Sequence, residues 1–284
     1  MQGRVVVITG ASSGIGEAAA VALARLGATV VPVGRDRRRL EQVARRVERV
    51  NPGGAAEPLR ADFASLGQVR ELAGALREQH PHIHALVNNA GMVSGSRSLT
   101  EDGYESTFAV NHLAPFLLTN LLLDVLEESA PARIVTTSSD AHRSGSIDLD
   151  DLQGERKWSA WSAYSNSKLA NVLFIRALAK RLDPAEVTAN CLHPGVIRTR
   201  LGRGTALPIR LGWRVTALFF KSPSRGASTI VHLVSSDDGG QATGEYFVDS
   251  RRVHPSRKAQ DEDLAERLWE ASETLTEIRS PAQR

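Results

Sequence analysis

Short apolar runs alternate with longer amphipathic stretches along almost the whole chain. Most of the apolar runs are rich in Val, Ile and Leu, a pattern typical of parallel strands that are buried on both faces. These runs predict strands at residues 4–9, 29–33, 57–61, 85–87, 133–137, 187–192 and 244–248. The stretches between them repeat apolar residues at helical spacing, and they predict helices at 17–26, 36–50, 66–78, 101–110, 113–128, 158–182, 224–235 and 261–278.

This alternation runs on without an internal repeat or a low-complexity linker, so residues 1–284 are expected to form a single domain. Alternating strands and helices predict the α/β class, here a doubly wound Rossmann fold with about seven parallel strands flanked by helices. The C-terminal helix is expected at about 261–278. Residues 207–220 are amphipathic with two clustered cations. They predict either a lid at about 200–222 over a hydrophobic substrate or an interfacial helix.

Composition narrows the class of protein. Hydrophobic residues make up 42% of the chain and charged residues 24%, as in soluble globular proteins. The 35 basic and 32 acidic side chains leave a formal charge of +3, which over 284 residues is too weak a field to indicate nucleic acid as a partner. The single cysteine, Cys191, lies in an apolar run and fits a buried position in a reducing compartment.

The sequence also predicts where the protein resides. It enters its first strand almost at once, which leaves no room for a signal peptide. No apolar run approaches the roughly 20 residues that span a bilayer. A cytoplasmic protein without a membrane span is therefore expected.

The first strand leads into a glycine-rich turn, GASSGIG, at residues 10–16, and an Ala-rich helix follows it. The spacing is GxxxGxG, formed by Gly10, Gly14 and Gly16. Glycines allow a tight turn and a close approach of the backbone, and a helix N-terminus offers free N–H groups to a pyrophosphate. Ser12, Ser13 and Thr9 add hydroxyl donors. The unit predicts a dinucleotide site.

The end of the second strand bears on the choice of cofactor. An acid near this position usually holds the ribose 2′-OH of NAD, whereas a cation suits the 2′-phosphate of NADP. Here Arg35 comes first and Asp36 follows, within a positive stretch. NADP(H) is therefore preferred over NAD(H), although a solvated helix start with Asp36 as its N-cap is an alternative interpretation. Asp62, at the end of the third strand, fits either an adenine contact or a loop cap.

Tyr164 and Lys168 are four residues apart in a helical stretch, so their side chains share one face. A nearby ammonium favours the phenolate and lowers the pKa of a tyrosine, which would make a proton donor usable near neutral pH. For the pair in isolation, a surface tyrosine with a solvated lysine is the favoured interpretation. Two further polar features lie where catalytic groups collect: Ser138-Ser139 at a strand end, and Asn111 in an apolar run where a helix is interrupted.

The three histidines within residues 80–84 first suggest a metal. They lie in a surface turn without a cluster of carboxylates, so no metal site is predicted there.

In this order and spacing, TGASSGIG, NNAG, VNHLAPF, the strand-ending SS, YSNSK and HPG resemble the short-chain dehydrogenase/reductase superfamily over about residues 4–249. VNHLAPFLLTNLLL, LQGE, YSNSKLANVLF, GEYF and RLWEASE are similar to its retinol dehydrogenase and WW-domain-oxidoreductase branch. The resemblance implies a catalytic tetrad of Asn111, Ser139, Tyr164 and Lys168. It also implies that cofactor is held by Gly10, Ser12, Ser13, Gly14, Ile15, Gly16, Arg35, Asp62, Asn89, Ala90, Gly91, Tyr164, Lys168, Pro194, Gly195 and Thr199.

The resemblance further implies an NAD(P)-dependent enzyme acting on a small hydrophobic alcohol or carbonyl compound. Ser139 would bond the substrate carbonyl, Tyr164 would exchange the proton, and Asn111 would hold a water of the proton relay. Lys168 would keep the tyrosine acidic and bind the nicotinamide ribose. A homo-oligomer formed through the long helices is also implied. Two other hypotheses stay open: a catalytically silent protein that senses NADP(H), and a sugar-nucleotide epimerase on a related fold.

Overall fold

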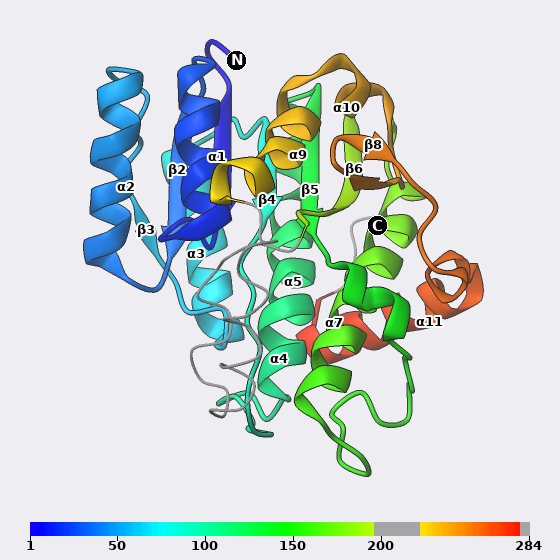
Figure 1. Cartoon of the computed structure of the whole chain (residues 1–284). Helices are drawn as coiled ribbons and strands as arrows, with labels where there is room; N and C mark the ends of the chain where they lie inside the picture. The colour runs from blue at the N-terminus through cyan, green and yellow to red at the C-terminus, as the bar shows by residue number, and fades with distance from the viewer. Residues whose placement is uncertain (196–221, 279–284) are drawn as a thin grey trace.

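The structure is a computed structural model, and it describes residues 1–195 and 222–278 (Figure 1). Within these residues one sheet has the strand order β3-β2-β1-β4-β5-β6-β7-β8. The strands are β1 (Val5–Thr9), β2 (Thr29–Gly34), β3 (Leu59–Arg60), β4 (Ala85–Asn88), β5 (Ala132–Thr137), β6 (Val187–His193), β7 (Tyr246–Val248) and β8 (Arg251–Arg252). All pairings from β3 to β7 are parallel, as expected for a doubly wound fold.

Helices cover both faces of the sheet. One face carries α1 (Gly14–Arg25), α2 (Arg37–Val50) and α9 (Pro223–Ser235), which stand in front of the sheet in Figure 1. The other face carries α3 (Leu66–Gln79), α5 (Ala114–Leu121), α7 (Ala160–Ala179) and α11 (Glu262–Thr276). Within β1, Val6 and Ile8 pack in the core under α1, α2 and α9, and Val7 packs in the core on the other face of the sheet. This alternation explains why the strands read as continuous apolar runs.

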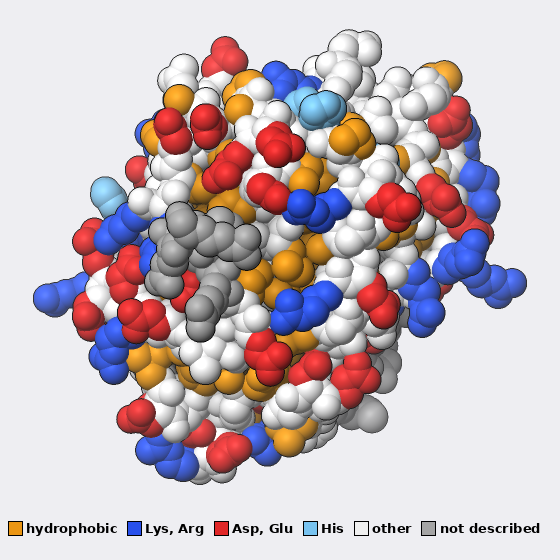
Figure 2. All heavy atoms as spheres, turned by 180° about the vertical axis from the view of Figure 1, so that it is seen from behind, with side chains coloured by type: hydrophobic (Ala, Val, Ile, Leu, Met, Phe, Trp, Pro, Cys, Tyr) orange, Lys and Arg blue, Asp and Glu red, His pale blue; other side chains and the backbone are white. Residues whose placement is uncertain are grey.

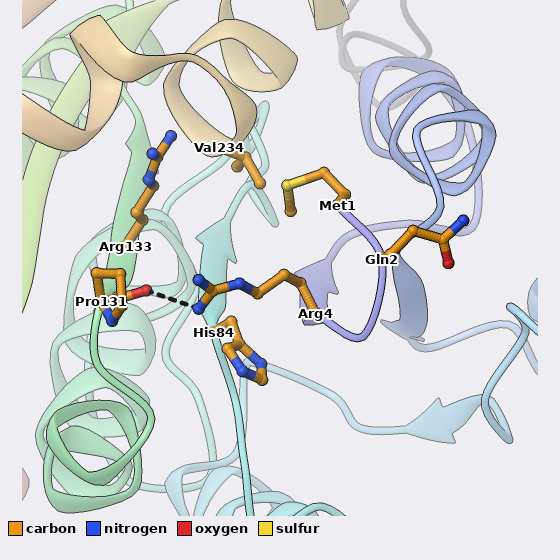
Figure 3. A pocket seen from close by; sticks show the side chains of 7 residues that line it. All are labelled: Met1, Gln2, Arg4, His84, Pro131, Arg133 and Val234. Atoms are coloured by element: carbon orange, nitrogen blue, oxygen red, sulfur yellow. Dashed lines mark hydrogen bonds between the residues drawn. The ribbon is translucent and has the colours of Figure 1, made fainter.

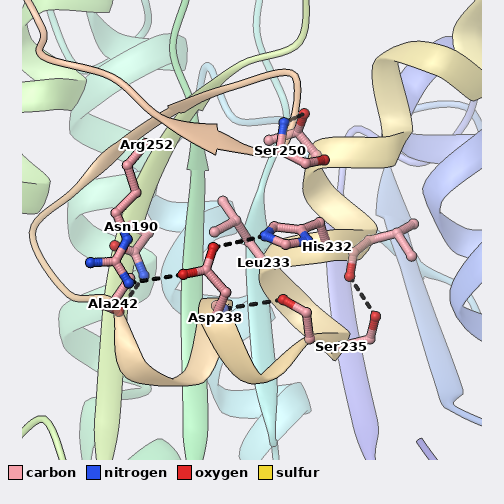
Figure 4. A network of polar contacts seen from close by, with 12 residues as sticks. Asn190, His232, Leu233, Ser235, Asp238, Ala242, Ser250 and Arg252 are labelled. Carbon is pink, nitrogen blue, oxygen red and sulfur yellow. Dashed lines mark hydrogen bonds and ion pairs between the residues drawn. The ribbon is translucent and has the colours of Figure 1, made fainter.

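The structure corrects the expected sheet at its outer edge. An eighth, two-residue strand, β8, pairs with β7 in the antiparallel direction, so the sheet is not purely parallel. A polar network holds this edge (Figure 4). Asp238, on α10 (Asp237–Gln241), accepts from Arg252 at 2.9 Å and lies 3.0 Å from His232 Nε2. The carboxylate thus joins β8 to α9 and α10.

The structure also corrects the helix expected at 101–110. Residues 101–104 form a turn, and only the short α4 (Ser106–Phe108) follows before a π-helix, η1 (Ala109–Leu113). The chain continues as α5 and α6 (Leu123–Glu128). A π-turn widens the helix by one residue, and such turns occur frequently at functional sites. The widened turn includes Asn111.

The C-terminal helix α11 packs across α7 and covers part of the long helices. Trp269 lies 4.9 Å from the ring of Phe116 and 5.8 Å from that of Phe174, and all three side chains are buried. A homo-oligomer would therefore have to use surfaces other than this one. No helix in the described part of the chain is both long and apolar enough to cross a membrane. The face in Figure 2 intersperses acidic and basic side chains around an apolar area.

Candidate active site

The carboxyl ends of β1, β4, β5 and β6 lie next to one another, because these strands are neighbours in the sheet. Ligands of doubly wound sheets bind at this edge. The glycine-rich turn follows β1, NNAG begins at the end of β4, Ser138-Ser139 follows β5, and HPG begins at the end of β6. The fold therefore brings together motifs that are far apart in the sequence.

The glycine-rich turn is packed too tightly for side chains at two positions. Gly10 has φ +66°, and a Cβ added there would lie 2.8 Å from Ala90 Cα. A Cβ on Gly16 would lie 2.5 Å from the Gly10 carbonyl oxygen and 2.6 Å from Asn89 Nδ2. Both glycines are therefore needed to seat the loop against the end of β4.

A clamp between β1 and β4 supports this turn. Thr9 Oγ1 donates to Val87 O and accepts from the backbone N–H groups of Asn89 and Ala90, each at 3.0 Å. The Asn89 amide in turn donates to the carbonyl of Thr9 at 2.9 Å. Asn89 and Ala90, expected as cofactor residues, thus shape the cradle. Sequence reasoning noted Thr9 only as a hydroxyl donor, because nothing in a single strand reveals its partner strand.

The backbone N–H groups in the first turn of α1 lie beside this cradle. Ser13 is the N-cap in extended conformation, but its side chain makes no cap hydrogen bond. Ser12, Ser13, Gly14 and Ile15 are partly exposed here. An uncapped helix start beside a side-chain-free loop fits a pyrophosphate, because the free N–H groups and the helix dipole favour an anion. The residues present therefore fit a dinucleotide.

The end of β2 presents a cation with little competition from acids. The Arg35 side chain is 66% exposed, and its guanidinium lies 3.8 Å from Asp62 Oδ1. Asp36 caps α2 by accepting from Arg39 N at 3.2 Å, and its carboxylate pairs with Arg39 Nε at 3.1 Å. The N-cap interpretation of Asp36 is thus confirmed, and Asp36 is already engaged. Asp62 also accepts from Ala64 N at 3.0 Å, as a loop cap does.

Asn111 is fully buried, and its side chain forms three hydrogen bonds. Its Oδ1 accepts from Met92 N at 2.7 Å. Its Nδ2 donates to Met92 O at 3.0 Å and to Ser167 Oγ at 2.9 Å. The side chain therefore ties the loop after β4 to α7, and a relay water would have to use the main-chain carbonyl. Ser167 was not singled out from the sequence, although it lies within YSNSK.

Gly91 lets the loop after β4 approach two tetrad residues. A Cβ on Gly91 would lie 3.3 Å from Asn111 Oδ1 and 3.5 Å from Lys168 Nζ. The Lys168 ammonium is 5.7 Å from the centroid of the Tyr164 ring. The carboxyl end of β4 is thus where three tetrad residues meet, Asn111, Tyr164 and Lys168.

Local contacts fix α7 and the end of β5 around this point. Ser159 forms a capping box with Ser162, which sets the first turn of the helix that carries Tyr164. Ser138 Oγ donates to Lys168 O at 2.7 Å, so the first serine of the pair is structural. Ser139 is partly exposed, and its nearby hydroxyl lowers the pKa of Tyr164. Ser139 stays the predicted catalytic serine of the pair.

The charge state of the pair differs in part from the expectation. Burial lowers the pKa of Lys168 to about 8, so the ammonium remains charged at neutral pH while it donates to Thr137 O at 3.0 Å. Burial also raises the pKa of Tyr164 above its ordinary value, and the nearby Ser139 hydroxyl opposes this shift. This direction differs from the expected one, because desolvation of the phenolate is the largest cause. Acidification of Tyr164 by Lys168 stays a prediction.

The HPG turn, residues 193–195, ends the first described part of the chain. Pro194 is buried directly after β6, and Gly195 has φ +85°, which suits a glycine. Thr199 and the segment expected as a lid or interfacial helix, about 200–222 with 207–220 at its centre, lie outside the described residues except for Ser222 at its end.

Other candidate chemistries have structural explanations. Cys191 is buried, which raises the pKa of its thiol to about 12 and keeps it protonated. His84 Nδ1 accepts from Val5 N at 3.1 Å, and no group of three metal-ligating side chains occurs among the described residues. A hollow of about 190 Å³ lies at the opposite, amino-terminal edge of the sheet (Figure 3). There Arg4 donates to Pro131 O, and Arg133 donates to carbonyls at the end of α9.

The chain is similar to known short-chain dehydrogenases. The family model described as "short chain dehydrogenase" matches residues 4–207. Retinol dehydrogenase 14 of Mus musculus is 44% identical, with 98% of this chain and 87% of the relative covered. A candidate daunorubicin C-13 ketoreductase of Streptomyces sp. (strain C5) is 46% identical, covering 96% and 92%. A candidate short chain dehydrogenase from Shigella flexneri 2a, solved with NADP, has a TM-score of 0.68 at 27% identity, covering 88% and 98%.

Proposed function

The chain belongs to the short-chain dehydrogenase family, and on that premise we propose that it transfers a hydride between NADP(H) and a hydrophobic alcohol or carbonyl compound. As a member it is an NAD(P)-dependent oxidoreductase that acts on CH–OH groups. The observation that carries the proposal is the convergence of Asn111, Tyr164 and Lys168 beside Gly91, with the Ser139 hydroxyl near enough to Tyr164 to lower its pKa.

The tetrad residues have distinct tasks in this reaction. When bound, the nicotinamide cofactor supplies or accepts the hydride. The Ser139 hydroxyl donates a hydrogen bond to the substrate carbonyl and so stabilises the oxygen as negative charge develops. The Tyr164 phenol, whose pKa the nearby Ser139 hydroxyl lowers, gives its proton to that oxygen, or takes it back in the opposite direction.

Lys168 and Asn111 support this proton transfer. The Lys168 ammonium, charged below a pH of about 8, favours the phenolate that remains when Tyr164 has lost its proton. The Asn111 side chain fixes η1 to α7 through Ser167, which leaves its main-chain carbonyl for the relay water. Proton supply from solvent would then pass along Lys168.

The preference for NADP(H) rests on the end of β2. Arg35 is exposed there and able to reach a 2′-phosphate, which two charge-assisted hydrogen bonds from a guanidinium would hold well. Asp36 is already engaged with Arg39 and with the start of α2, so it competes poorly for the ribose diol of NAD. The NADP named for the Shigella relative is consistent with this preference.

A hydrophobic substrate is supported by one aromatic side chain. Trp161 lies one turn before Tyr164 on α7, remains 60% exposed, and has its ring centroid 6.4 Å from that of Tyr164. Trp158, by contrast, is partly buried and donates to Glu105 at 3.3 Å. An apolar substituent next to the reacting carbon would therefore meet Trp161. The names of the two relatives, a retinol dehydrogenase and a ketoreductase, fit such a substrate.

The test is NADPH oxidation with retinal, aliphatic aldehydes and cyclic ketones, comparing wild type with Tyr164→Phe. Loss of the proton donor should lower kcat at least about 100-fold. Tyr104→Phe is the matched control, because the Tyr104 hydroxyl donates to Leu275 O, away from the tetrad. Equal rates for wild type and Tyr164→Phe would refute the mechanism. Tight NADPH binding without reduction of any carbonyl would instead favour a sensing protein.

A further inference from the structure

Outside the tetrad, His142 makes an unusual pair of contacts. It lies three residues after Ser139, in the short 3₁₀ helix η2 (Asp140–Ser144), and its side chain is fully buried. Its Nδ1 is 2.8 Å from the Ser139 carbonyl oxygen, and its Nε2 accepts from the backbone N–H of Ser256 at 3.0 Å. The imidazole thus bridges the main chain of a tetrad residue and a segment more than one hundred residues later.

These two contacts determine the protonation state of the ring. A carbonyl oxygen can only accept and a backbone N–H can only donate, so the proton must be on Nδ1 and the lone pair on Nε2. A second proton, on Nε2, would place an N–H group opposite the backbone N–H of Ser256, and the hydrogen bond between them would be lost. Burial acts in the same direction and lowers the pKa of His142.

The groups around the ring add charge of both signs. On η2 itself Asp140 and Arg143 form an ion pair at 2.8 Å; the carboxylate raises the pKa of His142 and the guanidinium lowers it. The ring of Tyr246, on β7, lies 4.9 Å away, and burial raises the pKa of that phenol so that it remains neutral. In residues 253–260, which face η2, Lys258 carries a positive charge and donates to Gly145 O at 3.1 Å.

The facing segment, residues 253–260, is attached to η2 at several points. Besides Ser256, its His254 carbonyl accepts from Arg143 at 3.3 Å, and Lys258 reaches the end of η2. Gly145, at that end, has no room for a side chain, since a Cβ would lie 2.6 Å from Ser165 O on α7. The chain that carries Ser139 is therefore held between α7 and residues 253–260.

We propose that His142 is a positioning residue: in its neutral Nδ1–H form it anchors the Ser139 carbonyl to residues 253–260 and so directs the Ser139 hydroxyl at the substrate. The inference rests on the proposed function, because it concerns the same reaction. The Ser139 backbone is extended, with φ −158° and ψ 157°, and its hydroxyl accepts from Ala141 N at 3.2 Å. The Ser139 carbonyl also accepts from the backbone N–H of His142 at 3.1 Å, so loss of the imidazole removes only its tie to Ser256. Without that tie η2 is held less firmly against residues 253–260, and the Ser139 hydroxyl is displaced.

The test compares two variants that differ in one hydrogen bond. His142→Phe keeps a ring beside Tyr246 but loses both contacts, whereas His142→Asn places an amide N–H near the position of Nδ1. A displacement of the order of an ångström can cost about 100-fold in rate. We expect His142→Phe to lower kcat about 10- to 100-fold with little change in the Kd for NADPH, and His142→Asn to recover at least a third of the wild-type kcat.

Two controls separate positioning from general loss of structure. His84→Phe removes a single backbone contact at the opposite edge of the sheet and should change kcat less than about threefold. In wild type, kcat should decline below pH 6.5 as His142 takes up a proton, and the decline attributable to this group should be absent in His142→Asn. Thermal melting verifies that each variant is folded.

The outcomes are distinguishable. If wild type turns over and His142→Phe matches it within about threefold, or if His142→Asn keeps the acid decline of wild type, the positioning role is wrong while the proposed function stands. If His142→Phe does not fold, His142→Asn and its pH profile decide. If wild type reduces no carbonyl with NADPH or NADH, the proposed function fails, and the inference fails with it.

Discussion

Replacing the buried His112 by glutamine should make the stability of the fold less sensitive to acid. The side chain is fully buried in η1, with the rings of Phe108 and Phe116 at 5.0 and 6.2 Å. Its Nε2 lies 2.9 Å from Ser272 Oγ, whose own proton goes to Leu268 O at 2.7 Å. Nε2 therefore carries the proton, and the ring is neutral.

The magnitude follows from the pKa of this group. Burial lowers the pKa of His112 from 6.5 to about 4, while the neighbouring amide of Asn171 opposes the shift. Between pH 6.5 and about pH 4 the unfolded chain binds a proton at His112 that the folded chain does not bind. The free energy of unfolding therefore falls as the pH drops below 6.5. The full difference corresponds to about 3 kcal/mol, of which about 2 kcal/mol is lost between pH 7.5 and pH 5. The total free energy of unfolding of a folded domain is only about 5–15 kcal/mol.

The assay is urea unfolding at pH 7.5 and pH 5, followed by tryptophan fluorescence. Between these two pH values the free energy of unfolding should fall about 2 kcal/mol more in wild type than in His112→Gln, at equal m-values. Glutamine retains a donor for Ser272 but does not titrate. His82→Gln, at an exposed turn, should leave the wild-type decline unchanged. The reasoning is refuted if His112→Gln loses as much stability as wild type.

Further predictions concern the cofactor and substrate sites. Arg35→Ala should lower kcat/KM for NADPH about 10- to 100-fold and change kcat/KM for NADH less than about threefold. The reason is that a charge-assisted phosphate contact contributes about 1.5–3 kcal/mol. Arg37→Ala is the control, because Arg37 pairs with Glu41 on the surface. Gly16→Ala should abolish cofactor binding in a titration and lower stability by about 1–3 kcal/mol, since its Cβ would lie 2.5 Å from a backbone oxygen. Trp161→Ala should raise KM about 10-fold for retinal and little for a two-carbon aldehyde.

Much of the fold could be predicted because parallel strands leave a strong signal. β1 and β2 place apolar side chains on both faces of the sheet, a pattern typical of strands covered by helices on both sides. The strand β8 could not be predicted, because two exposed arginines have no hydrophobic pattern. Likewise, the pattern around Asn111 predicts a helix but cannot distinguish α from π geometry, since the extra residue per turn is set by packing against α7 and α11.

The candidate site was predictable as a set of residues but not as a set of contacts. Tyr164, Lys168 and Ser139 could be selected from motifs and strand ends. That Asn111 forms hydrogen bonds with Met92 and Ser167, or that His142 anchors Ser139, depends on segments brought together only by folding. The pKa of Tyr164 could not be predicted from the spacing of a tyrosine and a lysine, because it depends on how deeply the pair is buried.

The attachment of residues 253–260 to η2 has a consequence for the order of biosynthesis. A ribosome delivers the nucleotide cradle, Ser139 and Tyr164 well before Ser256, because these residues precede it in the chain. The nascent chain can therefore build the cofactor half of the sheet while the support for Ser139 is still missing. Ser139 should acquire that support only once residues 253–260 have been synthesised.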